Sequence, residues 1–337
     1  MNLSEFDYNL PKELIAQYPL PKRDEARLMV VERKTGNIEH RIFRELPGFF
    51  RKDDLLVLND TKVLRCRLKG NRLTGGKVEI FLLGKKDGLT FQAMISPARV
   101  REGEKIVFPN TGITCTVTGH NLVSFQAKNE EAVYNLGVIP LPPYIKREAE
   151  PLDSEFYQTV YARENGSVAS PTAGLHFTGE LLDEIKKSGT GIAYVTLHVG
   201  EATFRPVKSE EITGHKMGSE FYRISEDTQK KLAAFNRQPR GTPERKGRVF
   251  AVGTTSCRTL ETFASTGRTE GYTDLFIYPG YEFKIVDCLL TNFHLPKTTL
   301  FMLVCALCGQ PLAQKAYAEA VSNKYRFYSY GDAMLIL

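Results

Sequence analysis

The chain has 337 residues, of which 42% are hydrophobic and 10% aromatic, and 45 Lys and Arg against 39 Asp and Glu give a net charge of +6. This composition supports a sizeable hydrophobic core and excludes disorder as the main state. A transmembrane helix is excluded as well, because the longest apolar run, 300–308, has half of the ~18 residues that a helix needs to cross a bilayer. The segment Met1–Asp7 lacks the apolar stretch of a secretory signal, so we expect a cytoplasmic protein without membrane partners.

The first half of the chain predicts a central sheet that is interrupted by a β-rich insertion. The short apolar runs 27–31 and 54–58 are typical of strands buried on both faces. After Asp60, short strand-like runs alternate with Gly-rich turns, at 64–68, 77–83, 89–95, 105–108, 113–118 and 122–127. We therefore expect a small barrel-like all-β domain at 61–144, which ends in the Pro-rich segment 140–144, and a discontinuous α/β domain formed by 1–60 and 145–337.

From Asp153 onward, helix and strand patterns alternate. Thr178 is a candidate N-cap for a helix that ends at Gly189. After it we expect a strand at 194–198, a helix from Ser225, a strand at 249–252, a helix after Thr255, a strand at 274–278, and helices around 300–307 and 313–321. This alternation predicts an α/β fold with a mainly parallel or mixed sheet flanked by helices.

The six cysteines lie in apolar or strand-like surroundings without the spacing of a disulfide framework. Cys305 and Cys308 form a C-x-x-C pair, a spacing that zinc sites and redox sites use. No second pair of ligands accompanies it, and the run 300–308 has the pattern of a buried helix. We therefore interpret these residues as reduced thiols of the core.

Basic residues are concentrated in one stretch near the middle of the second half. Between Lys230 and Arg248 there are seven basic residues and one acid, and Pro and Gly between them predict an exposed loop. One interpretation is a flap that contacts nucleic-acid phosphates, with Lys246 and Arg248 as candidate contacts. The other is a solvated connector, and the sequence leaves both open.

Polar and Gly-rich segments follow several predicted strands, at the edge of the sheet where α/β proteins bind ligands. Gly253, Thr254, Thr255 and Ser256 lie between a buried strand and a helix, where free N–H groups and small hydroxyls hold a carboxylate or a phosphate, and Arg258 is placed to reinforce such a site. The same residues also suit a simple helix cap. Neither a Walker loop nor a G-x-G-x-x-G is present, which disfavours nucleotide hydrolysis and dinucleotide redox chemistry.

Histidines near these turns are candidates for proton transfer. His176 lies in a loop of small residues just before Thr178, where an imidazole exchanges protons near neutral pH unless it is a buried structural ring. His198, His215 and His294 also lie near polar turns, so a zinc site assembled from distant loops remains an alternative. Candidate carboxylates are Glu201, Glu220, Asp274 and Asp332, although each type is more often a surface or capping group.

Seven segments together carry a resemblance that runs from end to end. They are 54–62, Pro140-Leu-Pro-Pro-Tyr144, 157–162, Pro171-Thr-Ala-Gly-Leu-His-Phe-Thr178, 252–256, Leu290-Thr-Asn-Phe-His-Leu-Pro296 and 325–336. The chain resembles the S-adenosylmethionine:tRNA ribosyltransferase-isomerases of queuosine biosynthesis. It departs from the pattern at Gly218, where the family usually has His, and we assign no role to that position.

The resemblance implies that the ribosyl moiety of S-adenosylmethionine is transferred to the 7-aminomethyl-7-deazaguanine base at the wobble position of tRNA and is isomerised there. The products would be epoxyqueuosine-tRNA, adenine and methionine. S-adenosylmethionine is then a substrate and tRNA a partner, and we expect no prosthetic group, no metal and a monomeric enzyme.

The reaction needs a base beside the sulfonium, an acid for adenine departure, and groups that tolerate a cation. From chemistry and placement, we predict proton transfer by His176 and His215, with Asp60, Glu201 and Asp274 as electrostatic partners. Predicted substrate-binding residues are Thr172, Gly174, Gly253, Thr254, Thr255, Ser256, Arg258, Asn292 and His294. Two rival functions remain: a metal-dependent hydrolase that uses the dispersed histidines, and a non-catalytic RNA-binding module.

Overall fold

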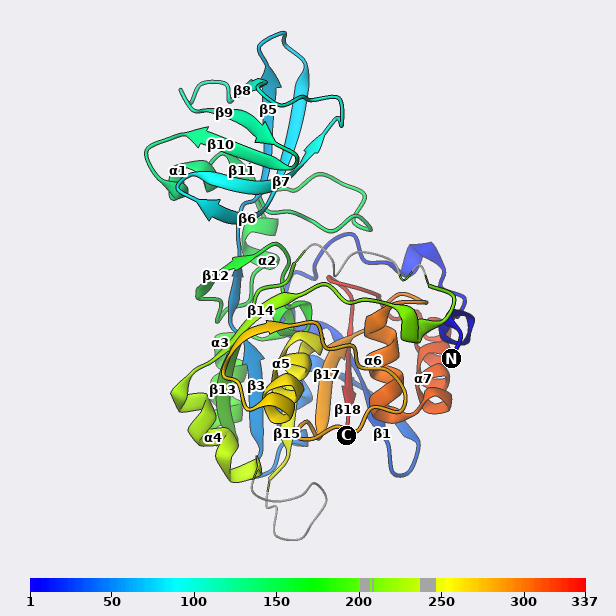
Figure 1. Cartoon of the computed structure of the whole chain (residues 1–337). Helices are drawn as coiled ribbons and strands as arrows, with labels where there is room; N and C mark the ends of the chain where they lie inside the picture. The colour runs from blue at the N-terminus through cyan, green and yellow to red at the C-terminus, as the bar shows by residue number, and fades with distance from the viewer. Residues whose placement is uncertain (201–206, 208, 237–246) are drawn as a thin grey trace.

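The computed structural model describes residues 1–200, 207, 209–236 and 247–337. Figure 1 shows a large lower part, in which helices flank a broad sheet, and a smaller β-rich part above it. Strand β3 (Leu55–Asn59) of the large sheet leads through β4 (Thr61–Val63) into the upper part. The carboxyl end of β3 therefore points toward the upper part.

The large sheet is mixed and has nine strands in the order β16-β14-β13-β3-β15-β17-β18-β1-β2. At its centre, β3 pairs in parallel with β13 and β15, and β15 pairs in parallel with β17. The other strand pairs are antiparallel except β1 with β18. The remaining strands are β1 (Arg27–Glu32), β2 (Asn37–Ile42), β13 (Gly191–Leu197), β14 (Glu220–Ile224), β15 (Val249–Val252), β16 (Glu270–Thr273), β17 (Cys288–Asn292) and β18 (Ala333–Ile336).

Both faces of this sheet are covered, which explains the uninterrupted apolar runs of its central strands. In β3, Leu55 and Val57 join one core cluster, while Leu56 and Leu58 join the other, as the two-residue period of a strand requires. The first cluster includes residues of α5 (Gly253–Thr266), α6 (Thr299–Cys308) and α7 (Gln310–Ser322), and the second includes residues of α3 (Gly179–Lys187) and of the 3₁₀ helix η4 (Phe43–Phe49). Helix α4 (Glu226–Asn236) packs beside β13. The α/β fold with flanking helices is confirmed.

The upper part is a six-stranded antiparallel barrel. Its strands follow the order β5-β6-β7-β10-β9-β8, and the pairing of β5 with β8 closes the ring. A seventh strand, β11 (Gly137–Val138), pairs with the other end of β5. The barrel strands are β5 (Arg67–Arg72), β6 (Lys77–Asp87), β7 (Thr90–Ser96), β8 (Lys105–Val107), β9 (Thr114–Gly119) and β10 (Leu122–Gln126), and the short helix α1 (Glu130–Tyr134) follows them. The barrel has its own core cluster, separate from those of the large sheet.

A two-stranded parallel pair of β4 with β12 (Glu164–Ser167) lies between the two parts, and the short helix α2 (Asp153–Phe156) lies close to it. The barrel strands all fall between Arg67 and Val138, within the expected insertion. The predicted boundaries at 60/61 and 144/145 themselves stay a prediction.

One predicted strand is wrong. Residues 274–278 are not a strand, and the edge strand β16 ends before them at Thr273. Here the backbone forms hydrogen bonds with side chains and not with a neighbouring strand. Thr273 Oγ1 accepts from Leu275 N, and Arg258 Nε donates to Leu275 O. The apolar residues of this segment pack against the core of the large sheet, which accounts for their strand-like pattern.

The C-x-x-C pair lies on α6 as expected of a buried helix. Cys305 is 1% exposed, and burial raises the pKa of the Cys308 thiol to about 12. Within the described ranges, no three His, Cys, Asp or Glu side chains are grouped as metal ligands. No helix among those residues combines the length and the apolar character needed to cross a membrane.

Candidate active site

A pocket opens at the carboxyl edge of the large sheet, where β15 and β17 end. Its walls come from the segment before and within the 3₁₀ helix η5 (Thr172–His176), from the first turn of α5, from the residues after β17, and from two tyrosine-bearing segments. The lining residues are Tyr144, Tyr157, Ala169, Ser170, Pro171, Thr172, Ala173, Val199, Gly253, Thr254, Thr255, Thr291, Asn292, His294, Leu300, Tyr328 and Ser329. Among these described residues there is no Asp, Glu, Lys or Arg.

The amino end of α5 forms one wall. The chain turns from β15 into α5 at Gly253, whose φ of +81° lies in the left-handed region that favours glycine. The N-cap residue is Val252, and no side chain caps the helix. The first N–H groups of a helix have no partner within it, and the helix dipole adds partial positive charge there. This 14-residue helix therefore presents an end that favours an anion.

Two residues that line the pocket carry hydroxyl groups without a protein partner. Ser170 is 6% exposed, and its Oγ is buried with no hydrogen-bond partner. The same is true of Thr255 Oγ1. Buried hydroxyls normally have partners, because an unpaired polar group in a protein interior costs free energy. Two such groups in one pocket, one of them in the first turn of α5, indicate a place where a polar ligand supplies the missing hydrogen bonds.

Tyrosines form another wall. The rings of Tyr144 and Tyr328 meet edge to face, and the hydroxyl of Tyr144 pairs with Ser329. Tyr157 is 1% exposed, and its hydroxyl also interacts with Ser329. These hydroxyls are engaged with the protein, so the rings themselves are what the wall offers to a ligand. Aromatic faces attract cations.

A hydrogen-bond network holds Asn292 at the bottom of the pocket. Its Oδ1 accepts from Thr172 Oγ1 at 2.8 Å, and its Nδ2 lies 3.1 Å from His176 Nε2 and 3.3 Å from the carbonyl of Asp332. Both amide hydrogens therefore have acceptors, which makes His176 Nε2 the unprotonated nitrogen of its ring. The His176 ring is also hydrogen-bonded to the backbone of Arg23 and packs on Phe43.

His176 thus lies behind Asn292. It borders a second, smaller hollow with Arg23, Leu175 and Tyr330 and does not line the main pocket. Burial lowers the pKa of His176 to about 4, so the ring is neutral at neutral pH. In this geometry the ring contacts Asn292, and Asn292 is the residue that faces the pocket. The predicted role of His176 in proton transfer stays a prediction.

His294 lines the main pocket directly. Its Nε2 pairs with Thr291 Oγ1 at 2.8 Å, and burial lowers its pKa to about 3. The backbone around it is held by Tyr8 and Tyr317. The ring is therefore a fixed, neutral part of the wall.

Six of the nine predicted substrate-binding residues line the pocket: Thr172, Gly253, Thr254, Thr255, Asn292 and His294. The other three do not. A Cβ at Gly174 would lie 2.0 Å from the hydroxyl of Tyr161, so this glycine makes room for a tyrosine. Ser256 is fully buried away from the pocket. Arg258 pairs with buried Glu220 and donates to the carbonyls of Leu275 and Thr273.

Because of these contacts, Arg258 does not reinforce an anion site in the pocket, contrary to the expectation from the sequence. On α5, Arg258 is more than a helical turn past Thr254, and its guanidinium reaches toward β14 and β16. Glu220 in turn accepts from the N–H of Gly200 at 2.9 Å. The pair holds the end of β13 in place.

The other predicted catalytic residues are not brought together at the pocket. Asp60 is 1% exposed and is bound by Thr196 and Arg163. Burial raises the pKa of Asp60, although these two hydrogen bonds lower it. His215 contacts the ring of Phe276, and burial lowers its pKa. Asp274 is exposed. None of the three lines the pocket. Glu201 lies outside the described residues.

Of the two predicted tRNA contacts, Lys246 lies outside the described residues, and Arg248 lies at the opposite edge of the sheet from the pocket. Arg248 immediately precedes β15, and its guanidinium binds Asp54 at 2.7 Å and the carbonyl of Phe49. Asp54 is 1% exposed at its side chain and Arg248 22%, so the pair is largely buried. In this structure the charge of Arg248 is balanced within the protein.

Sequence reasoning missed the tyrosine wall and Ser170. Tyr144, Tyr157 and Tyr328 each lie in a segment that the sequence singled out, but no pattern linked segments so far apart in the chain. The Pro-rich run 140–144 could have indicated Tyr144, because a stiff segment beside an α/β sheet holds an aromatic ring in a fixed position. No local pattern in the sequence points to Ser170, because what distinguishes this residue is that its buried hydroxyl has no hydrogen-bond partner.

The comparisons with known proteins agree along the whole chain. The family described as Queuosine biosynthesis protein matches residues 3–336. The S-adenosylmethionine:tRNA ribosyltransferase-isomerases of Symbiobacterium thermophilum and Thermotoga maritima are 52% and 50% identical, with 100% of each chain covered. A crystal structure of the S-adenosylmethionine tRNA ribosyltransferase of Thermotoga maritima covers 99% of this chain and 100% of its own, at 39% identity and a TM-score of 0.56. The chain therefore belongs to the queuosine biosynthesis family, and the curated relatives named above are enzymes of this ribosyltransferase-isomerase type.

Proposed function

We propose that this protein transfers and isomerises the ribosyl moiety of S-adenosylmethionine onto a 7-aminomethyl-7-deazaguanine base at the tRNA wobble position. The products are epoxyqueuosine-tRNA, adenine and methionine. Family membership supports the reaction type. The observation that carries the proposal is the pocket itself, which pairs an uncapped helix terminus with a wall of tyrosine rings and has no charged side chain among its described residues.

This pairing suits the methionine portion of S-adenosylmethionine. We propose that its carboxylate binds the N–H groups at Gly253–Thr255 and the hydroxyls of Ser170 and Thr255. The sulfonium then lies against the rings of Tyr144 and Tyr328, which attract a cation without neutralising it. An anionic side chain in this place would stabilise the sulfonium and oppose its departure as methionine.

Within the site, this chain's residues bind and orient the substrate. Asn292, which lines the pocket, is fixed by Thr172, His176 and Asp332. Proton transfer by His176 and His215, with Asp60, Glu201 and Asp274 as electrostatic partners, remains our proposal for the acid–base steps. The enzyme would act on tRNA in the cytoplasm as a monomer.

Two measurements on the purified protein test the proposal. Calorimetry should show binding of S-adenosylmethionine, and adenine release should require tRNA that carries the aminomethyl-deazaguanine base. Stoichiometric zinc together with hydrolysis of a substrate would instead support a metal-dependent hydrolase. RNA binding without any consumption of S-adenosylmethionine would support a non-catalytic RNA-binding module.

A further inference from the structure

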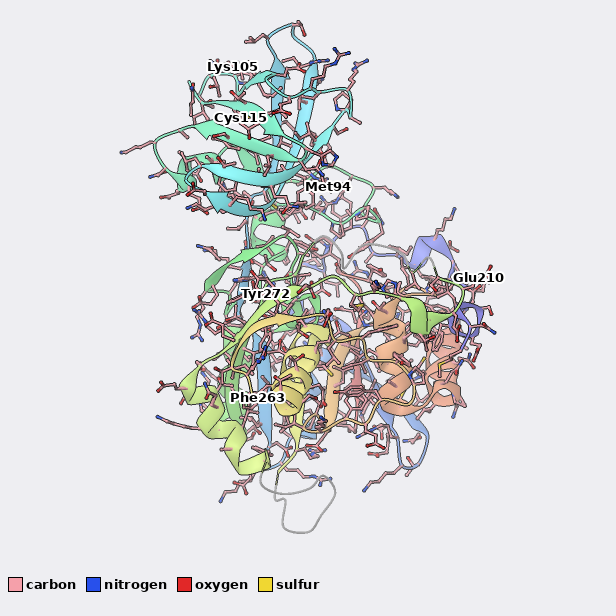
Figure 2. The ribbon with its side chains drawn as sticks, in the orientation of Figure 1. Met94, Lys105, Cys115, Glu210, Phe263 and Tyr272 are labelled. Carbon is pink, nitrogen blue, oxygen red and sulfur yellow. The ribbon has the colours of Figure 1, made fainter. Side chains whose placement is uncertain are left out.

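The edge of the large sheet carries an unusually exposed aromatic side chain. Tyr272 lies on the edge strand β16 and is 72% exposed, the highest value among the large hydrophobic side chains of the described residues. Figure 2 labels it on the main domain, in the half nearer the barrel. A single exposed aromatic residue needs no explanation, but Tyr272 is the outer end of an ordered row.

The row runs from β16 across β14 to the residue that follows β13. Tyr272 is opposite Phe221 of β14, and their rings meet edge to face at 5.7 Å. Phe221 in turn stacks on His198, just after β13, at 5.6 Å. The His198 ring is held by a 2.8 Å contact between its Nδ1 and Thr61 Oγ1, and burial lowers its pKa. The His198 ring thus fixes the position of Phe221, and the outer ring, Tyr272, stays open.

Two arginines stand beside this row. Arg223, two residues after Phe221, shares its face of β14, and its side chain is 46% exposed. Arg163 lies over the ring of Tyr194, and its side chain is 57% exposed. Arg223 pairs with exposed Glu164 at 2.7 Å, but an exposed ion pair contributes little and leaves further guanidinium donors for a phosphate.

Residues that hold the row are chain neighbours of residues that line the candidate active site and the groove below the barrel. His198 supports the row, while the next residue, Val199, lines the pocket. Thr61 and Glu164 belong to the β4–β12 pair, whose neighbouring residues Lys62 and Asn165 line a groove of about 790 Å³ between barrel and main domain. A strand lying on the row therefore leads toward both.

We propose that Tyr272, Phe221 and Arg223 bind an unpaired strand of the RNA substrate, with one base stacked on the Tyr272 ring and a phosphate on Arg223. The inference rests on the proposed function, since the RNA is the tRNA whose base enters the pocket. Aromatic rings beside arginines on a sheet are a common means of binding single-stranded RNA, because every base has a face that stacks. The row is fixed before binding, so little conformational entropy is lost when a base stacks on it.

The experiment compares binding of a labelled RNA stem–loop, which has an unpaired loop, with binding of a fully paired RNA duplex. Tyr272→Ala should weaken stem–loop binding about 5- to 150-fold, while Tyr272→Phe should bind like the wild type. Arg223→Gln should lower the dependence of binding on salt by about one phosphate contact. Tyr18→Ala removes another exposed tyrosine, which is 47% exposed and lies on Arg147, and should leave binding unchanged.

Two readouts separate this inference from the proposed function. Tyr272→Ala should bind S-adenosylmethionine normally and should release adenine at the wild-type rate when the tRNA is saturating, so that only KM for tRNA rises. If the wild type binds RNA and turns over while Tyr272→Ala has the same affinity, or if Tyr18→Ala weakens binding equally, the row is not the RNA site. A change in sedimentation on Tyr272→Ala with unchanged RNA affinity would show that a second copy of the chain covers this edge. A wild type that neither binds nor consumes S-adenosylmethionine would overturn the proposed function itself.

Discussion

Asn292 Nδ2 lies 3.1 Å from His176 Nε2, and this contact places the histidine behind the pocket wall instead of in it. The two residues are 116 positions apart, on η5 and at the end of β17. The amide also binds Thr172 and the carbonyl of Asp332, so the histidine is one of three groups that orient Asn292, which lines the pocket. In this arrangement the ring contacts the pocket wall through Asn292, so a role in orienting Asn292 stands beside the proton transfer proposed for His176.

Replacement of His176 distinguishes orientation from proton transfer. His176→Ala should lower both the melting temperature and the rate of adenine release, because it removes a buried ring and frees Asn292. His176→Gln places an amide oxygen near the position of Nε2, so it should restore most of the rate if the ring acts by orienting Asn292. If the Gln variant is folded and as slow as the Ala variant, by the factor of about 10² to 10⁴ typical of general acid–base catalysis, the ring itself transfers the proton.

The buried histidines predict how stability depends on pH. The pKa values of His176 and His294 in the folded protein, about 4 and about 3, lie below the value of about 6.5 in an unfolded chain. The unfolded chain therefore binds protons first as the pH falls, and the free energy of unfolding should decrease from about pH 6.5 toward pH 4. Urea titrations across this range measure the slope. His176→Gln should reduce it, and an unchanged slope would show that the ring is not buried as a neutral base.

Gly253 and Gly267 lie at opposite ends of α5, and both have φ in the left-handed region, at +81° and +70°. Alanine at either position should cost about 1–2 kcal/mol of unfolding free energy, because L-residues are strained there. A Cβ at Gly253 would also lie 3.5 Å from Thr255 Oγ1 and 3.8 Å from Ala173, between two walls of the pocket. Calorimetry should therefore show weaker S-adenosylmethionine binding for Gly253→Ala only. Equal binding by the two variants would remove the helix terminus from the proposed site.

Ser170 and Thr159 both carry a buried hydroxyl without a protein partner, but only Ser170 lines the pocket. Ser170→Ala should bind S-adenosylmethionine about 10- to 150-fold more weakly, the range for a hydrogen bond to a charged group, with no loss of stability. Thr159→Val is the matched control and should bind normally. Normal binding by Ser170→Ala would mean that the ligand carboxylate lies elsewhere.

Arg248 should contribute to stability more than to RNA binding. Arg248→Met leaves the buried carboxylate of Asp54 without its cation and should cost on the order of 3 kcal/mol in denaturant titrations. Lys230→Met removes an equal charge from an exposed position of the same basic stretch and should cost little. Loss of tRNA affinity in a fully stable Arg248→Met protein would restore the interpretation of this residue as a phosphate contact.

Local patterns in the sequence were sufficient for most of the framework. The apolar run at 54–58 gave a central strand, and Thr178 does cap α3, since its side chain accepts from the N–H of Leu181. The Gly-rich turns between 64 and 127 marked strands that form a separate barrel. Such features follow from a residue and its near neighbours, because backbone conformation and the side-chain period are set locally.

The hydrogen-bond and ion-pair partners of polar side chains could not be predicted from local patterns in the sequence. Whether His176 faces a substrate or Asn292, and whether Arg258 holds an anion or Glu220, depends on segments 116 and 38 residues away. The apolar segment 274–278 resembles a strand because its side chains are needed in the core, although Thr273 and Arg258 bind its backbone. The sequence by itself therefore determined most of the elements, the family and the edge of the sheet that carries the pocket. Only the tertiary structure decided which side chains face that pocket, because burial and hydrogen-bond pairing are properties of the packed chain.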